Sequence, residues 1–379
     1  MRRPVHFPKA ASALAVSLAL SLSAGAVAGE KTWTGAVSTS WGVADNWDPV
    51  GVPAATDDLI IAGGTVALGG TRTVEGSVLW SGGRIQQGTL EIVNGAAFRI
   101  TGEADKALDR VVLNNTGLLE WGGAGSLSAE MNSSSAVVAI NNLAGGELVL
   151  LSDAGLERTG SYASTSSAKV NVVNAGMMRK SGGTGTSSMG VRIDFTNEGI
   201  LDVGRGILEI QGPFGSGPES VIRTGVAGAE PGTGYGKLLL AGSASLDGRF
   251  EPYAVAGLLP DTVQEVVSLE GASLGGSFNQ VGLVPMGHGY IGQPVLVGNR
   301  VTTLVTYGVK LHLLTPVDGR FAVQIAGEPN TDYVLEASEG LVNWNEVTTL
   351  NSPTGLSDWV DDLIADHPQR FYRVLEAAD

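Results

Sequence analysis

The sequence contains no cysteine among its 379 residues, which excludes a disulfide framework, a thiolate metal site and a cysteine nucleophile. Basic residues are also few: 23 Lys and Arg stand against 38 Asp and Glu, giving a formal net charge of -15. This balance argues against nucleic-acid binding, which needs clustered lysine and arginine to contact phosphates. It equally disfavours adhesion to anionic lipid.

Glycine and hydrophobic residues dominate what is present. The 55 glycines are about twice the ordinary share, and 43% of residues are hydrophobic. This composition fits neither collagen nor a disordered linker. The length is ample for a buried core and allows two or three domains or one long repeat structure.

Residues 1–28 have the pattern of a secretory signal peptide. An apolar run at residues 11–22 is too short for a comfortable membrane span, and small residues at Ala26 and Ala28 mark a cleavage site. The positive residues before the run are Arg2, Arg3 and Lys9. Arg2 and Arg3 open a twin-arginine alternative, but the residues after them fit ordinary secretion better. We expect an exported protein with no transmembrane segment after signal cleavage, because no later apolar run is long enough.

Asparagine and glycine recur together just before short apolar segments, with intervals of 21, 27, 32 and 23 residues between successive asparagines. A turn signal and a strand returning at such intervals predict a β-solenoid, whose stacked coils bury a shared core. Asn and Gly suit its corners because both accept left-handed backbone angles, and stacked asparagines can hydrogen-bond between coils. A structural role is therefore favoured over ligand binding for Asn94, Asn115, Asn142, Asn174 and Asn197.

The segments between these turns alternate apolar and polar residues and are rich in β-branched side chains, which predicts strands. Examples are residues 90–93, 111–113, 137–140, 170–173, 191–195 and 207–210. No segment after the signal has a convincing amphipathic helix pattern. We expect an all-β protein: a β-solenoid, taken as a right-handed parallel β-helix, followed by a small C-terminal β-sandwich-like module.

Composition divides the exported chain into three parts. Residues 29–80 carry four of the seven tryptophans and are expected to form a Trp-rich N-terminal cap and the first coils. Residues 81–313 are expected to form the solenoid, with closing coils from about residue 237. Residues 314–379 follow a Pro-Val-Asp-Gly turn and are expected to form the C-terminal β module.

Residues 174–188, 195–203 and 206–210 resemble the repeats of large bacterial β-helical surface proteins, which are similar to autotransporter passengers and adhesins. The segment with Trp33, Trp41 and Trp47 resembles the opening of such proteins, and residues 239–248 and 275–281 resemble their closing coils. The resemblance implies an extracellular or cell-surface location and carries no catalytic residue or cofactor. The final residues show no membrane-barrel translocator pattern, so anchoring by that route is not expected.

The last segment resembles a small β module common at the ends of secreted proteins of environmental Gram-negative bacteria. The residues that carry this resemblance are 333–338, 341–344 and 370–374. The resemblance adds a Gram-negative origin to the expected secreted or cell-surface location.

Serine and acidic residues supply the candidate catalytic chemistry. Residues 271–275 match the Gly-x-Ser-x-Gly nucleophile elbow around Ser273, but that elbow needs a helix directly after it, and a turn and strand are expected instead. The histidines that could act as bases are His288, His312 and His367. Paired carboxylates on a solenoid face could cleave a polysaccharide; the candidate pairs are Asp194 with Asp202 and Glu209 with Glu219. Exposed strand positions are the favoured interpretation of these acids, and Ser273 is expected to be a turn residue.

Two acidic groupings are candidates for calcium, which takes oxygen ligands. They comprise Asp45, Asp48, Asp57 and Asp58 in the first and Asp358, Asp361, Asp362 and Asp366 in the second. Neither has EF-hand spacing or a glycine-rich calcium repeat, so solvated turn carboxylates are favoured. A zinc site is not expected, since no HExxH or cysteine pattern exists.

Aromatic residues could contact sugar rings through exposed faces. For Trp33, Trp41 and Trp47 we favour a cap that seals the open end of the solenoid, whose terminal coil would otherwise leave its core bare. Trp344 is expected in the core of the C-terminal module.

The sequence thus predicts an exported, non-catalytic structural or adhesive protein with no cofactor and no assigned catalytic or metal-binding residue. Its expected partner is an extracellular polysaccharide or a cell-envelope component, and nucleic acid is not expected. The alternative is a carbohydrate-binding or polysaccharide-cleaving protein that uses the solenoid face.

Overall fold

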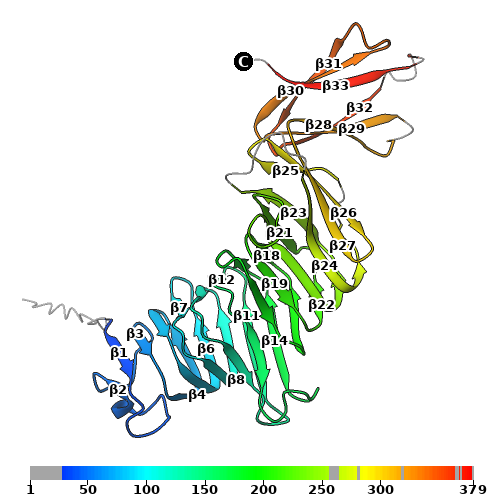
Figure 1. Ribbon diagram of the computed structural model, residues 1–379. Helices are drawn as coiled ribbons and strands as arrows, with labels where there is room; N and C mark the ends of the chain where they lie inside the picture. The colour runs from blue at the N-terminus through cyan, green and yellow to red at the C-terminus, as the bar shows by residue number, and fades with distance from the viewer. Residues whose placement is uncertain are drawn as a thin grey trace, which may run out of the picture.

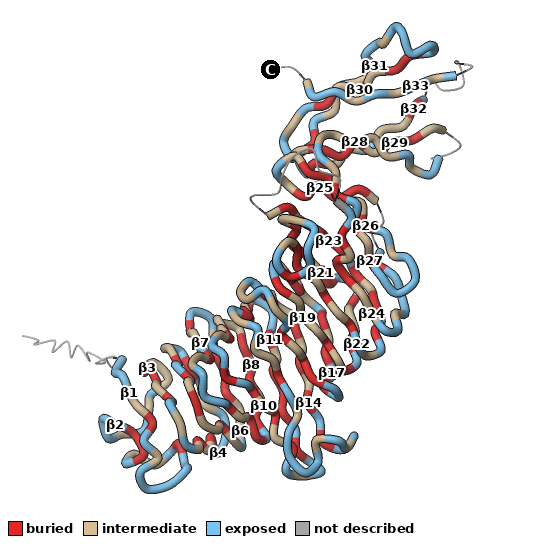
Figure 2. Tube along the Cα trace, viewed as in Figure 1, coloured by how far each residue is buried: buried red, intermediate tan, exposed pale blue. Residues whose placement is uncertain are grey.

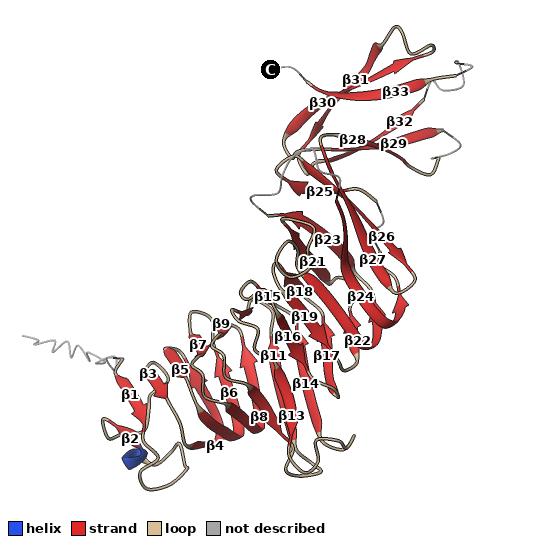
Figure 3. Cartoon of the chain, in the orientation of Figure 1, coloured by secondary structure: helices blue, strands red, loops and turns tan. Residues whose placement is uncertain are grey.

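The computed structural model describes residues 28–255, 264–279, 282–316, 320–362, 367 and 369–377. The expected signal peptide lies outside the described residues except for Ala28. The described chain is built from strands, with one short 3-10 turn, η1 (Ala44–Asn46) (Figure 3). The all-β class is therefore confirmed.

Two large sheets of mostly parallel strands run along the molecule (Figure 1). Sheet A has 11 strands, and every neighbouring pair except β1 with β2 is parallel. In spatial order these strands are β2 (Trp47–Asp48), β1 (Glu30–Trp33), β3 (Asp58–Ile61), β5 (Ser77–Trp80), β7 (Ala97–Ile100), β9 (Leu118–Trp121), β12 (Glu147–Leu150), β15 (Met177–Lys180), β18 (Ile200–Val203), β21 (Val221–Val226) and β23 (Arg249–Ala254).

Sheet B has 16 strands and covers two faces of each circuit of the chain. In the first circuits one long strand bends across both faces, as β4 (Thr65–Val74), β6 (Gly83–Ile92) and β8 (Lys106–Asn115) do. Later circuits use two short strands instead: β10 (Leu127–Glu130) and β11 (Val137–Asn142), β13 (Leu156–Thr159) and β14 (Lys169–Asn174), β16 (Thr186–Met189) and β17 (Ile193–Asn197), and β19 (Ile207–Ile210) and β20 (Phe214–Ser216). The long form returns in β22 (Lys237–Leu246) and β24 (Gln264–Gly276). We call the parallel part from β1 to β24 the stack.

One continuous apolar core fills the stack (Figure 2). Side chains alternate across a strand, so in β5 Val78 and Trp80 point inward, as do Phe98 and Ile100 in β7. Their neighbours from other circuits extend the same cluster from Trp33 to Val301. No single circuit encloses its own apolar side chains, and burial comes from stacking.

A ladder of buried asparagines joins four successive circuits, as the sequence predicted. Asn115 donates from Nδ2 to Oδ1 of Asn142 at 2.8 Å, and Asn142 donates in the same way to Asn174 at 2.7 Å. Asn174 continues to Asn197, also at 2.7 Å. All four side chains are buried. Asn94 is not a member: it lies exposed in a turn, and Ile92 is the register partner of Asn115.

Gly95 and Gly145 adopt the expected left-handed angles, but four other glycines of the same motif are required for a different reason. Gly117, Gly146, Gly176 and Gly199 do not adopt left-handed angles. A Cβ atom on Gly117 would lie 2.3 Å from the carbonyl oxygen of Val93, and one on Gly199 would lie 2.2 Å from that of Gly176. Glycine is required there because the neighbouring circuit approaches too closely for any side chain.

Three tryptophans close the N-terminal end of the stack. Trp33 and Trp41 each pack edge-on against Trp47, at ring-centroid distances of 5.0 and 4.9 Å. All three are buried, so none presents an open face for sugar stacking.

Antiparallel strands follow the stack. β24 pairs with β27 (Arg300–Tyr307), which pairs with β26 (Tyr290–Val297), and β26 pairs with β25 (Val284–Gly287). The chain then forms two three-stranded sheets, β28 (Lys310–Leu313), β29 (Phe321–Ala326) and β32 (Leu356–Asp361), and β31 (Asn345–Ser352), β30 (Thr331–Ser338) and β33 (Phe371–Glu376). We call β28 to β33 the C-terminal module. Its pairing begins at Lys310, before the boundary expected at residue 314.

Candidate functional site

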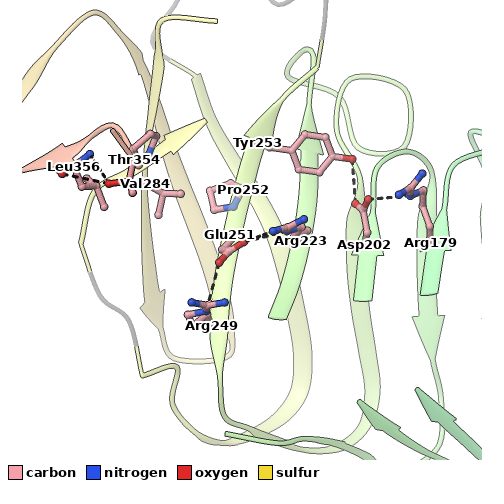
Figure 4. A pocket seen from close by; sticks show the side chains of 11 residues that line it. Arg179, Asp202, Arg223, Arg249, Glu251, Pro252, Tyr253, Val284, Thr354 and Leu356 are labelled. Atoms are coloured by element: carbon pink, nitrogen blue, oxygen red, sulfur yellow. Dashed lines mark hydrogen bonds and ion pairs between the residues drawn. The ribbon is translucent and has the colours of Figure 1, made fainter. Parts of the chain in front are cut away.

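A hollow of about 760 Å³ lies where the outer face of sheet A meets the C-terminal module (Figure 4). This volume is within the range of small-molecule sites. One wall comes from β15, β18, β21 and β23, and the other from β25 and the turn before β32. We call this space the junction hollow.

Of the five charged residues that line it, strand register places four in one row. Arg179 is paired with Asp202, Asp202 with Arg223, and Arg223 with Glu251 on successive parallel strands. Each occupies an outward position, and neighbouring strands lie about 4.8 Å apart. The row therefore alternates positive and negative charge.

The carboxylates of the row are held by arginines. Arg223 donates from Nε and Nη2 to Oε2 of Glu251, at 3.0 and 2.9 Å. Arg249 lies 3.4 Å from the other oxygen of Glu251. The side chains of Arg223 and Arg249 remain 39% and 52% exposed, so both guanidinium groups face solvent in the hollow.

Arg179 is held less firmly than Arg223, which makes two hydrogen bonds to Glu251. Its Nε lies 3.3 Å from Asp202 Oδ2 but is a buried donor without a hydrogen-bond acceptor in the described structure. Its Nη2 donates to the sulfur of Met177 at 2.9 Å, and a thioether is a weak acceptor.

Asp202 is the most buried charged group of the hollow, with 8% exposure. The Tyr253 hydroxyl donates to its Oδ1 at 3.0 Å. Burial raises the pKa of Asp202, and it outweighs the opposing effects of Tyr253 and the nearby arginines. Burial, with the adjacent carboxylate, also raises the pKa of Tyr253.

The opposite wall is mostly apolar and joins the module to the antiparallel strands that follow the stack. Val284 and Leu356 line the hollow, with Thr354 as a polar neighbour. Leu356 also packs against a buried cluster of Leu283, Ile291 and Ala326, which joins the β25–β26 hairpin to the C-terminal module. Pro252 lies on the last strand of sheet A, where a residue without an N–H is tolerated at a sheet edge.

The carboxylate pairs considered as candidates for cleavage are not brought together. Asp194 lies on β17 in sheet B, whereas Asp202 lies on β18 in sheet A. Glu209 lies on β19 and accepts from Ser188 Oγ at 2.7 Å, while Glu219 is exposed in the turn before β21. The idea that either pair shares a catalytic face is wrong.

Ser273 lies within strand β24, paired with Ser243, rather than in the expected turn. The strand continues to Gly276 and the described residues after it, 277–279, form no helix, so the context of a nucleophile elbow is missing. His288 is exposed in the turn between β25 and β26, and His312 lies on β28. His367 lies 2.6 Å from Glu339 through its Nδ1.

Most of the acidic residues named for calcium bind protein groups instead. Asp57 accepts from the backbone N–H groups of Gly29 and Ala54. Asp58 accepts from the N–H and hydroxyl of Ser77, both at 2.7 Å, and these bonds lower the pKa of Asp58. Asp45 lies in η1 and Asp48 is exposed on β2.

In the second grouping Asp361 is buried and binds Arg370 with both oxygens. Asp358 accepts from Gln324 at 2.9 Å, Asp362 contacts Arg320, and Asp366 lies outside the described residues. Over the described residues, no cluster of three His, Cys, Asp or Glu has the arrangement of a metal site.

Trp344 is not in the core of the module, contrary to expectation. It is half-buried, with the guanidinium of Arg373 4.5 Å above its ring. Trp359 packs against the module's core instead, together with Tyr372. The presence of a tryptophan in this segment therefore did not identify a core residue.

The charged row of the junction hollow was missed from the sequence, although a signal was present. Arg179 and Asp202 stand at the same offset after Asn174 and Asn197. Alignment of the repeats on those asparagines would have placed both side chains in one outward row.

No helix in the described part of the chain has the length and apolar character needed to cross a membrane. No family model matches the chain, and no match is found among curated proteins.

Proposed function

We propose that the protein is an exported, non-catalytic structural or adhesive protein that presents a rigid surface at the cell surface or in the extracellular matrix. In this proposal the stack is a right-handed parallel β-helix, and the C-terminal module is a sandwich-like unit at its end. The observation that carries the proposal is the single apolar core running from Trp33 to Val301. A core shared by all circuits resists bending, because no circuit moves without disturbing its neighbours.

Both ends of the stack differ from its repeated circuits, which suits a protein that must remain discrete outside the cell. The tryptophans close one end, and the antiparallel strands β25 to β27 follow the other. Exposed strand edges otherwise recruit further strands. We therefore infer a scaffold of fixed length rather than a fibre-forming unit.

The second candidate is a carbohydrate-binding protein, favoured by the junction hollow with its arginines and apolar wall. Cleavage is disfavoured because the carboxylates of the hollow, Asp202 and Glu251, each contact arginine. A glycosidase needs one carboxyl group as an acid and the other as a base or nucleophile.

Co-sedimentation separates these functions. Purified protein is incubated with the producer's envelope and with insoluble polysaccharides, and the same tubes are assayed for bound protein and new sugar ends. We expect binding without new ends. Release of sugar ends would contradict the non-catalytic proposal, and the absence of binding to every surface would contradict adhesion.

A further inference from the structure

We propose that the junction hollow binds the carboxylate groups of an acidic polysaccharide, through Arg179, Arg223 and Arg249. This inference rests on the proposed adhesive function and names the partner of that function. Uronate sugars combine a carboxylate with ring faces that carry C–H groups, and the hollow offers guanidinium groups opposite an apolar wall (Figure 4).

The charge of the hollow is opposite to that of the chain. Three arginines and two acids line it, whereas acidic residues exceed basic ones in the whole sequence. An anionic chain would be repelled by most of the molecule and attracted here, because charge patterns direct association.

The guanidinium groups retain donors for a ligand. Arginine carries five N–H donors, so the two bonds to Glu251 do not exhaust those of Arg223. Arg179 has a side chain that is 39% exposed, and its Nη2 is directed at the sulfur of Met177. An incoming carboxylate would supply a stronger acceptor, and arginine matches carboxylate geometry with paired bonds.

Spacing favours a polymer over a single anion. Arg179 and Arg223 lie on β15 and β21, the two strands that flank β18, so their backbones are about 10 Å apart. Both side chains project from the same outward row, and carboxylates on alternate sugars of a chain would meet them in turn. Asp202 between them would favour a neutral sugar hydroxyl.

The apolar wall supplies the second element of sugar recognition. Val284 and Leu356 line the side of the hollow that belongs to β25 and the module, and Tyr253 stands over Asp202. Sugar rings pack their C–H faces on such surfaces, while their hydroxyl groups bind polar neighbours. The module is therefore part of the site, since Leu356 reaches it only while docked.

Calorimetric titration with oligogalacturonate in calcium-free buffer tests the inference. The matched ligand is the methyl-esterified oligomer, which has the same rings without the charges. We expect binding of the acid form, at least about tenfold weaker binding of the ester, and loss of affinity with added salt. Equal binding of both forms, or no binding of the acid form, would overturn the inference.

The variants are Arg179→Gln and Arg249→Gln, with Arg99→Gln as control. Arg99 lies on the same outward face of sheet A and pairs with Glu120 at 2.5 Å, outside the hollow. Each hollow variant should weaken binding about tenfold, while the control leaves it unchanged. Arg249 is half-exposed, so its variant should fold even if the change at Arg179 disturbs the row. An equal loss in the control variant would contradict a site at the hollow.

Two further experiments are needed. One asks whether the hollow binds any anion or a polysaccharide carboxylate, and the other distinguishes failure of this inference from failure of the proposed function. Inorganic phosphate that displaces oligogalacturonate at equal concentration would identify a general anion site and overturn the polysaccharide assignment. In the co-sedimentation assay, wild-type-like binding of Arg249→Gln to envelopes would leave adhesion standing and reject the hollow. Loss of envelope binding in the wild-type protein would instead reject the proposed function itself.

Discussion

The stack and the C-terminal module are both built from strands but are held together differently. In the stack, short parallel strands bury alternate side chains in a core that continues through every circuit. In the module, antiparallel strands enclose a small core of Val323, Ile325, Tyr333 and Leu335, and β33 has no fully buried residue. A buried ion pair, Arg370 with Asp361, supplements that core.

Because the two cores are built differently, a substitution should have different consequences in the stack and in the module. A substitution in one circuit of the stack disturbs the packing of the circuits on either side. A substitution in the module affects one small unit, which buries little apolar surface. We therefore expect the two regions to unfold in separate transitions, as parts with separate cores do.

The largest effect is expected from Trp80→Ala in the stack. Trp80 is fully buried, packs against Phe98 and donates from Nε1 to the carbonyl of Gly82 at 2.9 Å. Its truncation should lower the free energy of unfolding of the stack by about 3–5 kcal/mol, measured by guanidinium denaturation. The matched change Trp344→Ala in the module removes a half-buried ring and should cost about 1 kcal/mol. Equal losses would contradict the contrast between the two cores.

The second prediction concerns the module. Arg370→Leu removes the cation that binds both carboxylate oxygens of Asp361, which is 1% exposed, and leaves the hydroxyl of Tyr372 as a donor. Removing one partner of a buried ion pair should cost about 3–5 kcal/mol, which is enough to unfold a small unit. Calorimetry should show the module transition lowered or lost and the stack transition unchanged. A shift of both transitions together would show that the regions unfold as one.

A substitution in the asparagine ladder should lower the free energy of unfolding by a smaller amount. Asn142→Ala removes both the acceptor of Asn115 and the donor of Asn174. Leaving these buried groups unsatisfied should destabilise the stack by about 1–3 kcal/mol. The exposed Asn94 is the control, and its change to alanine should stay within about 0.5 kcal/mol. Unfolding of both variants at the same denaturant concentration would show that the ladder does not stabilise the stack.

The smallest predicted effect is the pH dependence of the stability that Asp202 and Asp58 contribute. The two contributions should change in opposite directions. The pKa of Asp202 is raised above its unfolded value of 3.8 by burial, and that of Asp58 is lowered below 3.8 by bonds from Ser77. The stability contributed by Asp202 is therefore greatest in acid and falls as pH rises from 3.8 through its folded pKa. That contributed by Asp58 is present above 3.8 and is lost as pH falls through its folded pKa.

These contributions are measured by denaturant unfolding of the wild type and of the variants Asp202→Asn and Asp58→Asn, at a series of pH values from acid to neutral. The stability difference between wild type and Asp202→Asn should decrease with rising pH, and the difference for Asp58→Asn should increase. Two slopes of the same sign would show that burial does not control Asp202.

Much of the fold was predictable because its signals are local and repeated. The asparagines mark the corners, and four of them form the ladder that stacking requires. The candidate site was not predictable in the same way, because it joins strands of sheet A to Leu356 of the module. Trp344 and Asp202 were misplaced, since Trp344 lies outside the module's core and Asp202 is buried. The reason is that a residue type alone does not reveal which core it faces.

Amide hydrogen exchange with and without oligogalacturonate measures both whether the stack is rigid and whether its binding surface is the junction hollow. We predict slow exchange throughout the stack, faster exchange in the module, and added protection on ligand binding confined to β15, β18, β21, β23 and the turn before β32. Rapid exchange within the stack, or ligand protection centred on the tryptophan cap, would contradict this prediction.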